Sequence, residues 1–317
     1  MGATGRAVLV VSAHDDLTAK AITEELHRRS HPVERFDLGD FPAAVGFTAE
    51  LRGGRWHLAG ALDLERFGAI YYRRPTRFAF PDGLSAADRA FAAEEARLAV
   101  GGVLATFDGT WVNDPAKTAI AEYKPLQLSV AARIGLSVPH TLITNDHAAV
   151  AAFSEHNSHV VCKPLSSVAH RVDDSVRITY TTPIDGDDID PAMVGATAHL
   201  FQERVDKQYE VRVTMVGRRP LGVAIHAHSA AARRDWRSDY ASLTYAAAAV
   251  PAAVAERLCD YLDAFGLAFG AFDLVVTPED EWVFLECNPS GQWLWLERET
   301  GVPITSALAD LLTGKAT

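Results

Sequence analysis

The sequence predicts a parallel, doubly wound α/β domain over about the first 110 residues and a region of mixed helices and strands after it. At roughly 150 residues per domain, a chain of 317 residues fits two domains or three small ones. In the first part, short apolar runs alternate with amphipathic stretches, as strands and helices do in α/β proteins. From Val112 the pattern changes, and two late apolar runs flank Pro278-Glu279-Asp280, which predicts a hairpin.

The elements of the first part follow from apolar spacing and caps. Ile22 and Leu26 lie four residues apart in a segment with a polar outer face, and Ser85 is a plausible N-cap for an Ala-rich helix. The loop at 12–16 after the first strand has no glycine, and neither GxGxxG nor a Walker loop occurs, so we do not expect this domain to hold NAD or ATP phosphates in the usual way. Strands are expected at 6–13, 33–38 and 64–72, and helices at 18–30 and 85–104.

The second part begins with one long amphipathic helix, expected at 117–134 and ended by Gly135. An acidic turn is expected at 185–190. Further strands are expected at 138–144, 159–164, 175–182, 201–205, 209–216, 221–228, 269–277 and 281–286, and further helices at 148–155, 192–200 and 251–265.

Composition excludes several classes of protein. The chain has 30 Lys and Arg against 41 Asp and Glu, a formal charge of −11, so net charge attracts neither nucleic acid nor an anionic membrane. No apolar run approaches the roughly 18 residues that span a bilayer. The three cysteines (Cys162, Cys259 and Cys287) form no CxxC pair, which is typical of a reducing compartment. We therefore expect a cytoplasmic protein with neither a nucleic-acid nor a membrane partner.

The hairpin near the carboxyl end carries the strongest chemical signal. Because strand side chains alternate between faces, Glu286 and Asn288 point the same way while Cys287 points into the core. Asp273 on the neighbouring strand can complete a patch of three oxygen-bearing side chains. Hard oxygen ligands of this kind suit Mg²⁺ that also holds nucleotide phosphates. The alternative is that Asp273 caps a turn and Glu286 is a solvated strand end.

Phosphates need cations, and three basic residues occupy ordered positions. Lys163 ends an apolar strand, Lys124 lies on the long helix, and Arg212 follows Tyr209 on a strand. Each of these residues alone is more often a surface charge. Beside a metal patch, together they indicate a phosphate site.

In order and spacing these residues resemble the ATP-grasp superfamily, whose enzymes clamp ATP between two α+β lobes. The resemblance implies a pre-ATP-grasp α/β domain at 1–110, a small lobe at 111–205 and a C-terminal lobe with the Mg²⁺ and ATP site at 206–317. It also implies that Lys124 and Lys163 contact the phosphates and the adenine edge, and that adenine is bound by the hinge strand Gln202, Glu203, Arg204 and Val205. The ribose is expected at Asp206 or Glu210, beside Lys207. Arg212 is expected to bind the γ-phosphate, and Mg²⁺ is expected at Asp273, Glu286 and Asn288.

The match is closer to one branch, the ATP-grasp ribosomal peptide maturases that make graspetides (microviridin-type peptides). The segments that carry it are Tyr72-Arg73-Arg74-Pro75, Asn113-Asp114-Pro115, residues 207–214, Asp235-Trp236-Arg237 and residues 284–293. This resemblance implies that Asp or Glu side chains of a precursor peptide, made of a leader and a core, are activated as acyl phosphates. Attack by Thr or Ser then gives ω-ester macrocycles, and attack by Lys gives ω-amides. A homodimer is also expected from the resemblance alone.

A substrate carboxylate needs its own cation, and a guanidinium binds carboxylates bidentately. Arg237, next to Asp235 and Trp236, is the first choice for this contact, with Arg73 and Arg74 as second choices. The alternative for each arginine is a salt bridge within the protein. The catalytic set expected from the resemblance is Lys163, Arg212 and Arg237.

Extended peptides commonly add to an exposed sheet edge, so the segment 176–182, the acidic turn after it and the helix at 192–200 form a candidate leader site. One feature departs from the family pattern: the loop at 166–170 has no glycine where many ATP-grasp enzymes have a Gly-rich flap. Two other functions remain open, namely a small-molecule ligase of the glutathione-synthetase or dipeptide-ligase type and a nucleotide-binding regulator without turnover.

Overall fold

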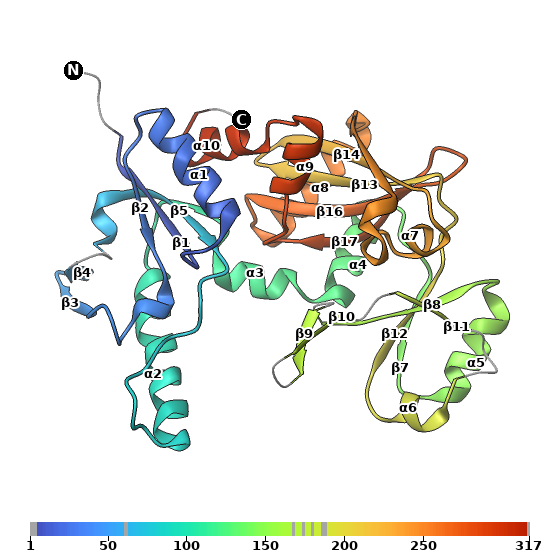
Figure 1. Ribbon diagram of the computed structural model, residues 1–317, viewed down its shortest axis with the longest axis horizontal. Helices are drawn as coiled ribbons and strands as arrows, with labels where there is room; N and C mark the ends of the chain where they lie inside the picture. Colours follow the sequence, from blue (N-terminus) through green and yellow to red (C-terminus); the bar gives the residue numbers. More distant parts are fainter. Residues whose placement is uncertain are drawn as a thin grey trace.

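The computed structural model describes residues 5–59, 63–166, 169–172, 175–178, 181–184 and 189–315, and Figure 1 shows three parts that follow one another along the chain. The first part is built on a parallel sheet in the order β2-β1-β5-β6. Its strands are β1 (Ala7–Ser12), β2 (Val33–Phe36), β5 (Phe67–Arg73) and β6 (Thr110–Val112).

Alternate side chains of β1 pack on opposite faces of this sheet. Val8 and Val10 pack with helix α1 (Leu17–Arg28), whereas Leu9 and Val11 pack with helix α2 (Ala86–Leu104). Helices therefore cover both faces, and the predicted doubly wound α/β domain is confirmed.

Helix α10 (Ile304–Leu312), from the other end of the chain, also covers this sheet (Figure 1). Arg29 at the end of α1 donates to Asp310 at 2.6 Å and to the backbone oxygen of Ser306 at 3.1 Å. Leu308 belongs to the same buried cluster as Val8 and Val10. The core of the first domain is thus completed by a late segment of the chain.

The first part also contains a hairpin that the apolar pattern did not predict. It consists of β3 (Thr48–Arg52) and β4 (Arg55–Ala59) and turns at Gly53-Gly54, where φ is +59° and +78°. Glycine adopts this left-handed conformation without steric cost, which suits a tight hairpin turn. Two short 3₁₀ turns cover Leu38–Asp40 and Leu64–Arg66.

The single helix expected at 117–134 is wrong, because the structure has two helices here. Helix α3 (Pro115–Ala121) ends before Tyr123, and helix α4 (Lys124–Arg133) begins with Pro125 in its first turn. Proline lacks the N–H that a helix interior needs, but it fits the start of a helix. The apolar spacing continues across this break and hides it.

The small lobe is an antiparallel sheet in the order β11-β8-β12-β7. Its elements are β7 (Thr141–Thr144), α5 (His147–His156), β8 (Val160–Lys163), β11 (Thr182–Ile184), α6 (Pro191–Gly195) and β12 (His199–Glu203), and a separate hairpin pairs β9 (Ala169–Val172) with β10 (Ser175–Ile178).

Two expectations for this lobe are wrong. The helix expected at 192–200 stops at Gly195, and Leu200 instead lies in β12, buried opposite Lys163. The strand expected at 175–182 is divided between β10 and β11, which belong to different sheets. The acidic residues 185–188 and positions 167–168 of the glycine-free loop lie outside the described residues.

The large lobe is an antiparallel sheet in the order β15-β14-β13-β16-β17. Its elements are β13 (Tyr209–Val216), β14 (Arg219–Ala227), α7 (Ala230–Arg234), 3₁₀ turns at Trp236–Ser238 and Tyr240–Ser242, β15 (Leu243–Ala248), α8 (Ala252–Phe265), β16 (Phe269–Val276), β17 (Trp282–Asn288) and α9 (Leu294–Thr300). The predicted C-terminal hairpin is therefore confirmed as β16 and β17.

The two faces of this sheet differ in polarity. On β13, Val211, Val213 and Met215 pack with α8 in one apolar cluster. On the other face, Val216 packs with α9 and α10, but Arg212, further toward the start of the strand, is charged. This charged half of the face carries the candidate site. None of the helices in the described part of the chain is long and apolar enough to cross a membrane.

Candidate active site

A row of charged residues crosses three neighbouring strands of the large lobe. In the sheet register Arg212 lies opposite Asp273, and Asp273 lies opposite Glu286. Arg212 Nη1 donates to Asp273 Oδ1 at 2.8 Å, and both residues are buried. Asn288 lies two residues beyond Glu286 on the same strand, opposite Ala271; it lines the second cavity with Glu286, whereas Asp273 lines the first cavity with Glu286.

Arg237 joins this row from outside the sheet. Its Nη2 donates to Asp273 Oδ2 at 2.7 Å and to Glu286 Oε1 at 3.2 Å. Asp235 accepts a hydrogen bond from the Arg237 backbone N–H at 3.1 Å, and the guanidinium carbon lies 4.6 Å from the Trp236 ring centroid. Asp235 and Trp236 are buried, so the two residues expected to bind substrate hold Arg237 in position.

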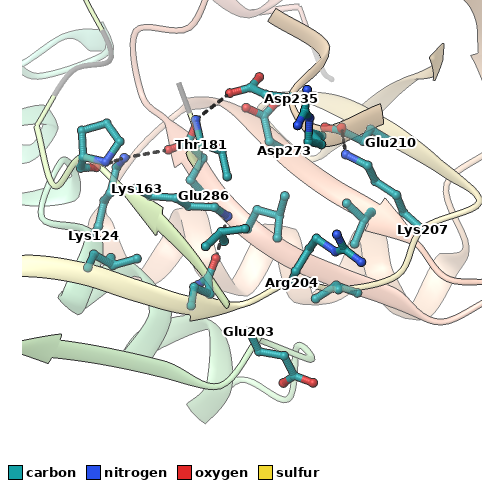
Figure 2. A pocket seen from close by; sticks show the side chains of 18 of the residues that line it. Lys124, Lys163, Thr181, Glu203, Arg204, Lys207, Glu210, Asp235, Asp273 and Glu286 are labelled. Carbon is teal, nitrogen blue, oxygen red and sulfur yellow. Dashed lines mark hydrogen bonds and ion pairs between the residues drawn. The ribbon is translucent and has the colours of Figure 1, made fainter. Parts of the chain in front are cut away.

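Two lysines reach the same row from the other side (Figure 2). Lys124 Nζ lies 3.3 Å from Glu286 Oε2 and donates to the backbone oxygen of Pro164 at 2.7 Å. Lys163 Nζ donates to Gln202 Oε1 at 2.6 Å. A contact between the lobes lies nearby, where the Thr181 N–H donates to Asp235 Oδ2 at 3.2 Å.

Two cavities meet at these residues, and their walls share Lys124, Arg237 and Glu286. The first cavity is narrow, at about 100 Å³, and the second is wide, at about 890 Å³. Of the expected residues, the first cavity is lined by Lys124, Lys163, Gln202, Glu203, Arg204, Val205, Lys207, Glu210, Asp235, Arg237, Asp273 and Glu286. The second is lined by Arg74, Lys124, Arg212, Trp236, Arg237, Glu286 and Asn288.

Burial and neighbouring charges shift several pKa values in this site. Burial lowers the pKa of Lys163 to about 8 despite the nearby Glu286. Burial alone would raise the pKa of Glu286, but Lys124, Arg237 and Lys163 outweigh it and lower that pKa to about 2. Burial raises the pKa of Asp273, although Arg212 and Arg237 oppose it. Burial likewise raises the pKa of Glu210, which forms an ion pair with Lys207.

The donor set at the row fits Mg²⁺. Two carboxylates, Asp273 and Glu286, and the amide of Asn288 offer the hard oxygen ligands that this ion prefers, and Mg²⁺ commonly takes one or two carboxylates together with substrate phosphates. In the structure both carboxylates are paired with arginine or lysine. Within the described residues, no set of three or more His, Cys, Asp or Glu side chains forms a metal cluster, so substrate oxygens would have to complete the coordination.

Arg73, a second choice for binding the substrate carboxylate, is occupied by contacts within the protein. Its side chain is only 2% exposed and lies 3.2 Å from Asp16. It donates to the backbone oxygens of Ser290 and Gly291 at 3.3 and 3.2 Å and to Gln292 Oε1 at 2.5 Å. Arg73 therefore ties the first domain to the loop after β17.

Arg74 and Asp206, by contrast, lie near the surface. The backbone of Arg74 has φ of +45°, and its side chain lines the second cavity without a hydrogen bond or ion pair to the described residues. The Asp206 side chain is 82% exposed and does not line the first cavity. Of the two ribose candidates, only Glu210 lies in the cavity wall.

Sequence reasoning gave no role to two buried amides that hold the strand of Glu286 and Asn288. Gln127 Oε1 accepts from the Cys287 N–H and its Nε2 donates to the Cys287 backbone oxygen, both at 2.9 Å. Asn113 Nδ2 donates to the Pro289 backbone oxygen at 2.8 Å. The available signal for Gln127 was a polar residue on the apolar face that carries Val130 and Ala131.

Comparisons with known proteins agree with this architecture. Residues 7–119 match the family model described as the MvdD pre-ATP grasp domain. A Chryseobacterium gregarium ATP-grasp ligase associated with ribosomal peptides, solved with ADP and a leader and core peptide, superposes with a TM-score of 0.88 at 26% identity over 98% of each chain.

Two macrocyclases from Microcystis aeruginosa are also similar. MdnC, solved with its precursor peptide MdnA, gives a TM-score of 0.82 at 28% identity over 97% of this chain and 99% of its own. MdnB gives 0.78 at 26% identity over 97% and 99%. No curated protein matches the sequence.

Proposed function

We propose that this chain, an ATP-grasp ligase of the kind that modifies ribosomal peptides, uses ATP to activate Asp or Glu side chains of a precursor peptide and joins them to Thr or Ser hydroxyls, or to Lys amines, of the same peptide. The observation that carries the proposal is the meeting of two cavities at one charged row, where Lys124, Arg237 and Glu286 face both. A nucleotide in one cavity and a peptide in the other would bring their anionic groups together there.

For the nucleotide, the lining of the first cavity supports the expected assignments. Val161, Leu200 and Val275 give it an apolar wall for adenine beside the hinge residues Gln202, Glu203, Arg204 and Val205. Lys124 and Lys163 then face the phosphates, and Glu210, paired with Lys207, lies where a ribose can be bound.

Phosphate transfer to a carboxylate requires two anions to meet, so catalysis is mostly positioning and charge neutralisation. Mg²⁺ held by Asp273, Glu286 and Asn288 would supply the positive charge that draws the phosphates and the substrate carboxylate together. The Arg212 guanidinium is fixed by Asp273, and the Arg237 guanidinium is fixed by Asp273 and by Asp235, whose Oδ1 lies 3.5 Å from Arg237 Nη1, so both groups are oriented before substrate binds.

For the substrate carboxylate, Arg74 and Arg237 are our assignments. Arg237 lies at the junction of the cavities but is shared with two protein carboxylates. Arg74 has no such partner among the described residues and faces the peptide cavity, which makes it suited to first contact with the acid.

The reaction balances without a protein nucleophile. A carboxylate oxygen of the peptide attacks the γ-phosphorus, the bond to the bridging oxygen breaks, and ADP leaves. A hydroxyl or amine then attacks the acyl carbon, phosphate leaves with the bonding pair, and the nucleophile loses its proton. The peptide thereby loses one water for each ring formed.

A ligase for small molecules would share the first cavity and differ in the second. The second cavity, at about 890 Å³, lies within the 300–1,000 Å³ that small-molecule pockets span, so its volume alone does not separate the two substrates and the test below is needed. We also propose a cytoplasmic location, in keeping with three free cysteines. Leader docking at the segment 176–182, the acidic turn after it and the helix that follows, and a homodimer, stay predictions.

Co-expression with a candidate precursor peptide that carries Asp or Glu together with Thr, Ser or Lys, read by intact mass, tests the proposal. The expected result is a peptide lighter by one water per ring, with no loss in a Glu286→Gln control. Unchanged peptide mass with the wild-type enzyme would contradict the proposed ligase activity, and steady turnover of a free amino acid would favour the small-molecule alternative. Removing the leader should raise KM sharply.

A further inference from the structure

The wide cavity has an aromatic wall that the reaction itself does not require. Trp236 and Trp295 stack with ring centroids 5.4 Å apart, Tyr240 meets Trp236 edge-on at 5.6 Å, and Tyr245 meets Trp295 edge-on at 5.1 Å. The four rings come from the 3₁₀ turns after α7, from β15 and from α9, and all four line this cavity.

These rings are not all core residues. Trp236 is 4% exposed and forms the base of the wall, whereas Tyr240 is 57% exposed and Tyr245 and Trp295 are half-buried. The indole N–H of Trp236 is buried with no acceptor among the described residues. Partly exposed rings in a concave site are typical of a surface that binds another molecule.

The wall is joined directly to the charged row. The Arg237 guanidinium lies over Trp236 and at the same time bonds Asp273 and Glu286. Neighbouring residues of an extended peptide are about 3.3 Å apart. A peptide whose acid is held at Arg237 therefore places the next residues against the rings.

Charge at the rim restricts what the wall accepts. Glu122 and Glu299 also line this cavity, so a second acid placed there would meet like charges. An apolar side chain would instead cover the exposed ring surface at no cost in desolvated charge.

We propose that Trp295, Tyr245 and Tyr240 form a subsite for an apolar or aromatic residue next to the acid to be activated, and that this subsite selects one acid among several in the core peptide. The inference rests on the proposed function, because it assumes that the second cavity receives the peptide. Trp295 and Tyr245 are specificity residues that contact the neighbour of the reacting residue, and the reacting groups themselves stay at Arg237 and Arg74.

Short probes test the subsite without a leader. Binding of acetyl-Glu-Phe-amide and acetyl-Phe-Glu-amide is measured by calorimetry in the presence of ADP and Mg²⁺, against the same probes with Ala or Asp in place of Phe. We expect at least one Phe probe to bind about tenfold more tightly than its Ala counterpart, and the Asp probes to bind most weakly. Trp295→Ala and Tyr245→Ala should each reduce the Phe preference to about threefold or less, with binding of the Ala probe unchanged.

Trp56→Ala, on the distant β4 strand, is the matched control and should keep the preference. Should Trp295→Ala not fold, Trp295→Leu replaces it, and the same loss of the Phe preference over Ala is expected. Equal binding of the Phe and Ala probes by the wild type, or an unaltered preference in both aromatic variants, overturns the subsite. Failure of the proposed function is a separate result, because it appears as unchanged precursor mass while probe binding reports the subsite alone.

Discussion

Gln127 offers a sharp test of how the site is held. Strand β17 is at the edge of its sheet, so within the described residues the backbone groups of Cys287, between Glu286 and Asn288, have no partner strand on the outer side. The Gln127 side chain takes the place of that strand by accepting from the Cys287 N–H and donating to its carbonyl, and it donates to the Ala121 carbonyl at 2.6 Å as well.

Gln127→Met keeps the volume of the side chain and removes these bonds. Leaving a buried N–H and a buried C=O unpaired costs about 1–3 kcal/mol each, so we expect the free energy of unfolding to fall by about 3 kcal/mol. Because the lost bonds flank Glu286 and Asn288, the Mg²⁺ concentration for half-maximal ADP formation should rise about tenfold, as it does when groups behind a metal ligand are removed.

Urea unfolding and an Mg²⁺ titration of precursor-dependent ADP release measure the two effects. Gln208→Met is the control for stability, since Gln208 is exposed and its side chain bonds none of the described residues. Wild-type stability and an unchanged Mg²⁺ requirement in Gln127→Met would refute the idea that this amide positions the ligand strand.

Three further predictions follow from named contacts. The pKa of Lys163 is about 8, so this side chain is neutral in the free enzyme above pH 8, whereas bound phosphates favour its charged form. ATP affinity, measured by calorimetry, should therefore fall by at most tenfold per pH unit as the pH rises above 8. Lys163→Arg should flatten this dependence. An added Cβ at Gly291 would lie 2.4 Å from the Ala271 Cβ and 2.9 Å from Arg212 Nη2. Gly291→Ala should therefore lower the free energy of unfolding in urea by about 1–3 kcal/mol and lower kcat. Gly101→Ala, in open space on α2, should instead raise the free energy of unfolding by about 0.5–1 kcal/mol. Arg237→Lys keeps the positive charge but loses the forked guanidinium that bonds both Asp273 and Glu286. Ring formation measured by mass should drop at least a hundredfold, while calorimetry should still detect ATP binding. Wild-type turnover in this variant would contradict the role of Arg237 at the junction of the two cavities.

Regular patterns were enough to predict much of the fold. Residues 209–216 form β13 as expected, since their β-branched and apolar side chains suit a buried central strand. The break before Pro125 was missed because apolar spacing continues through it. The end of α6 was missed because Gly195 is a weak signal inside an otherwise helical pattern, and only the pairing of Leu200 with Lys163 reveals a strand there.

The residues of the candidate site likewise fall into those that the sequence could predict and those that it could not. The pairing of Asp273 with Glu286 could be foreseen because strand periodicity fixes their faces, and the joint role of Asn288 stays a prediction. The partner of Arg73 could not be foreseen, since the chain returns to it at Ser290 only after the whole ATP-grasp fold has been built. The aromatic wall likewise could not be foreseen, because Trp236 and Tyr245 meet Trp295 from about 50 residues or more away in sequence.

The docking of α10 on α1 has a consequence for biosynthesis. Ribosomes release the amino-terminal sheet first, and one of its hydrophobic faces is covered by α1 without α10 until residues 304–312 emerge. During translation the part of that face that α10 will cover is open to solvent and to chaperones. The domain made first is thus the last to reach its final stability.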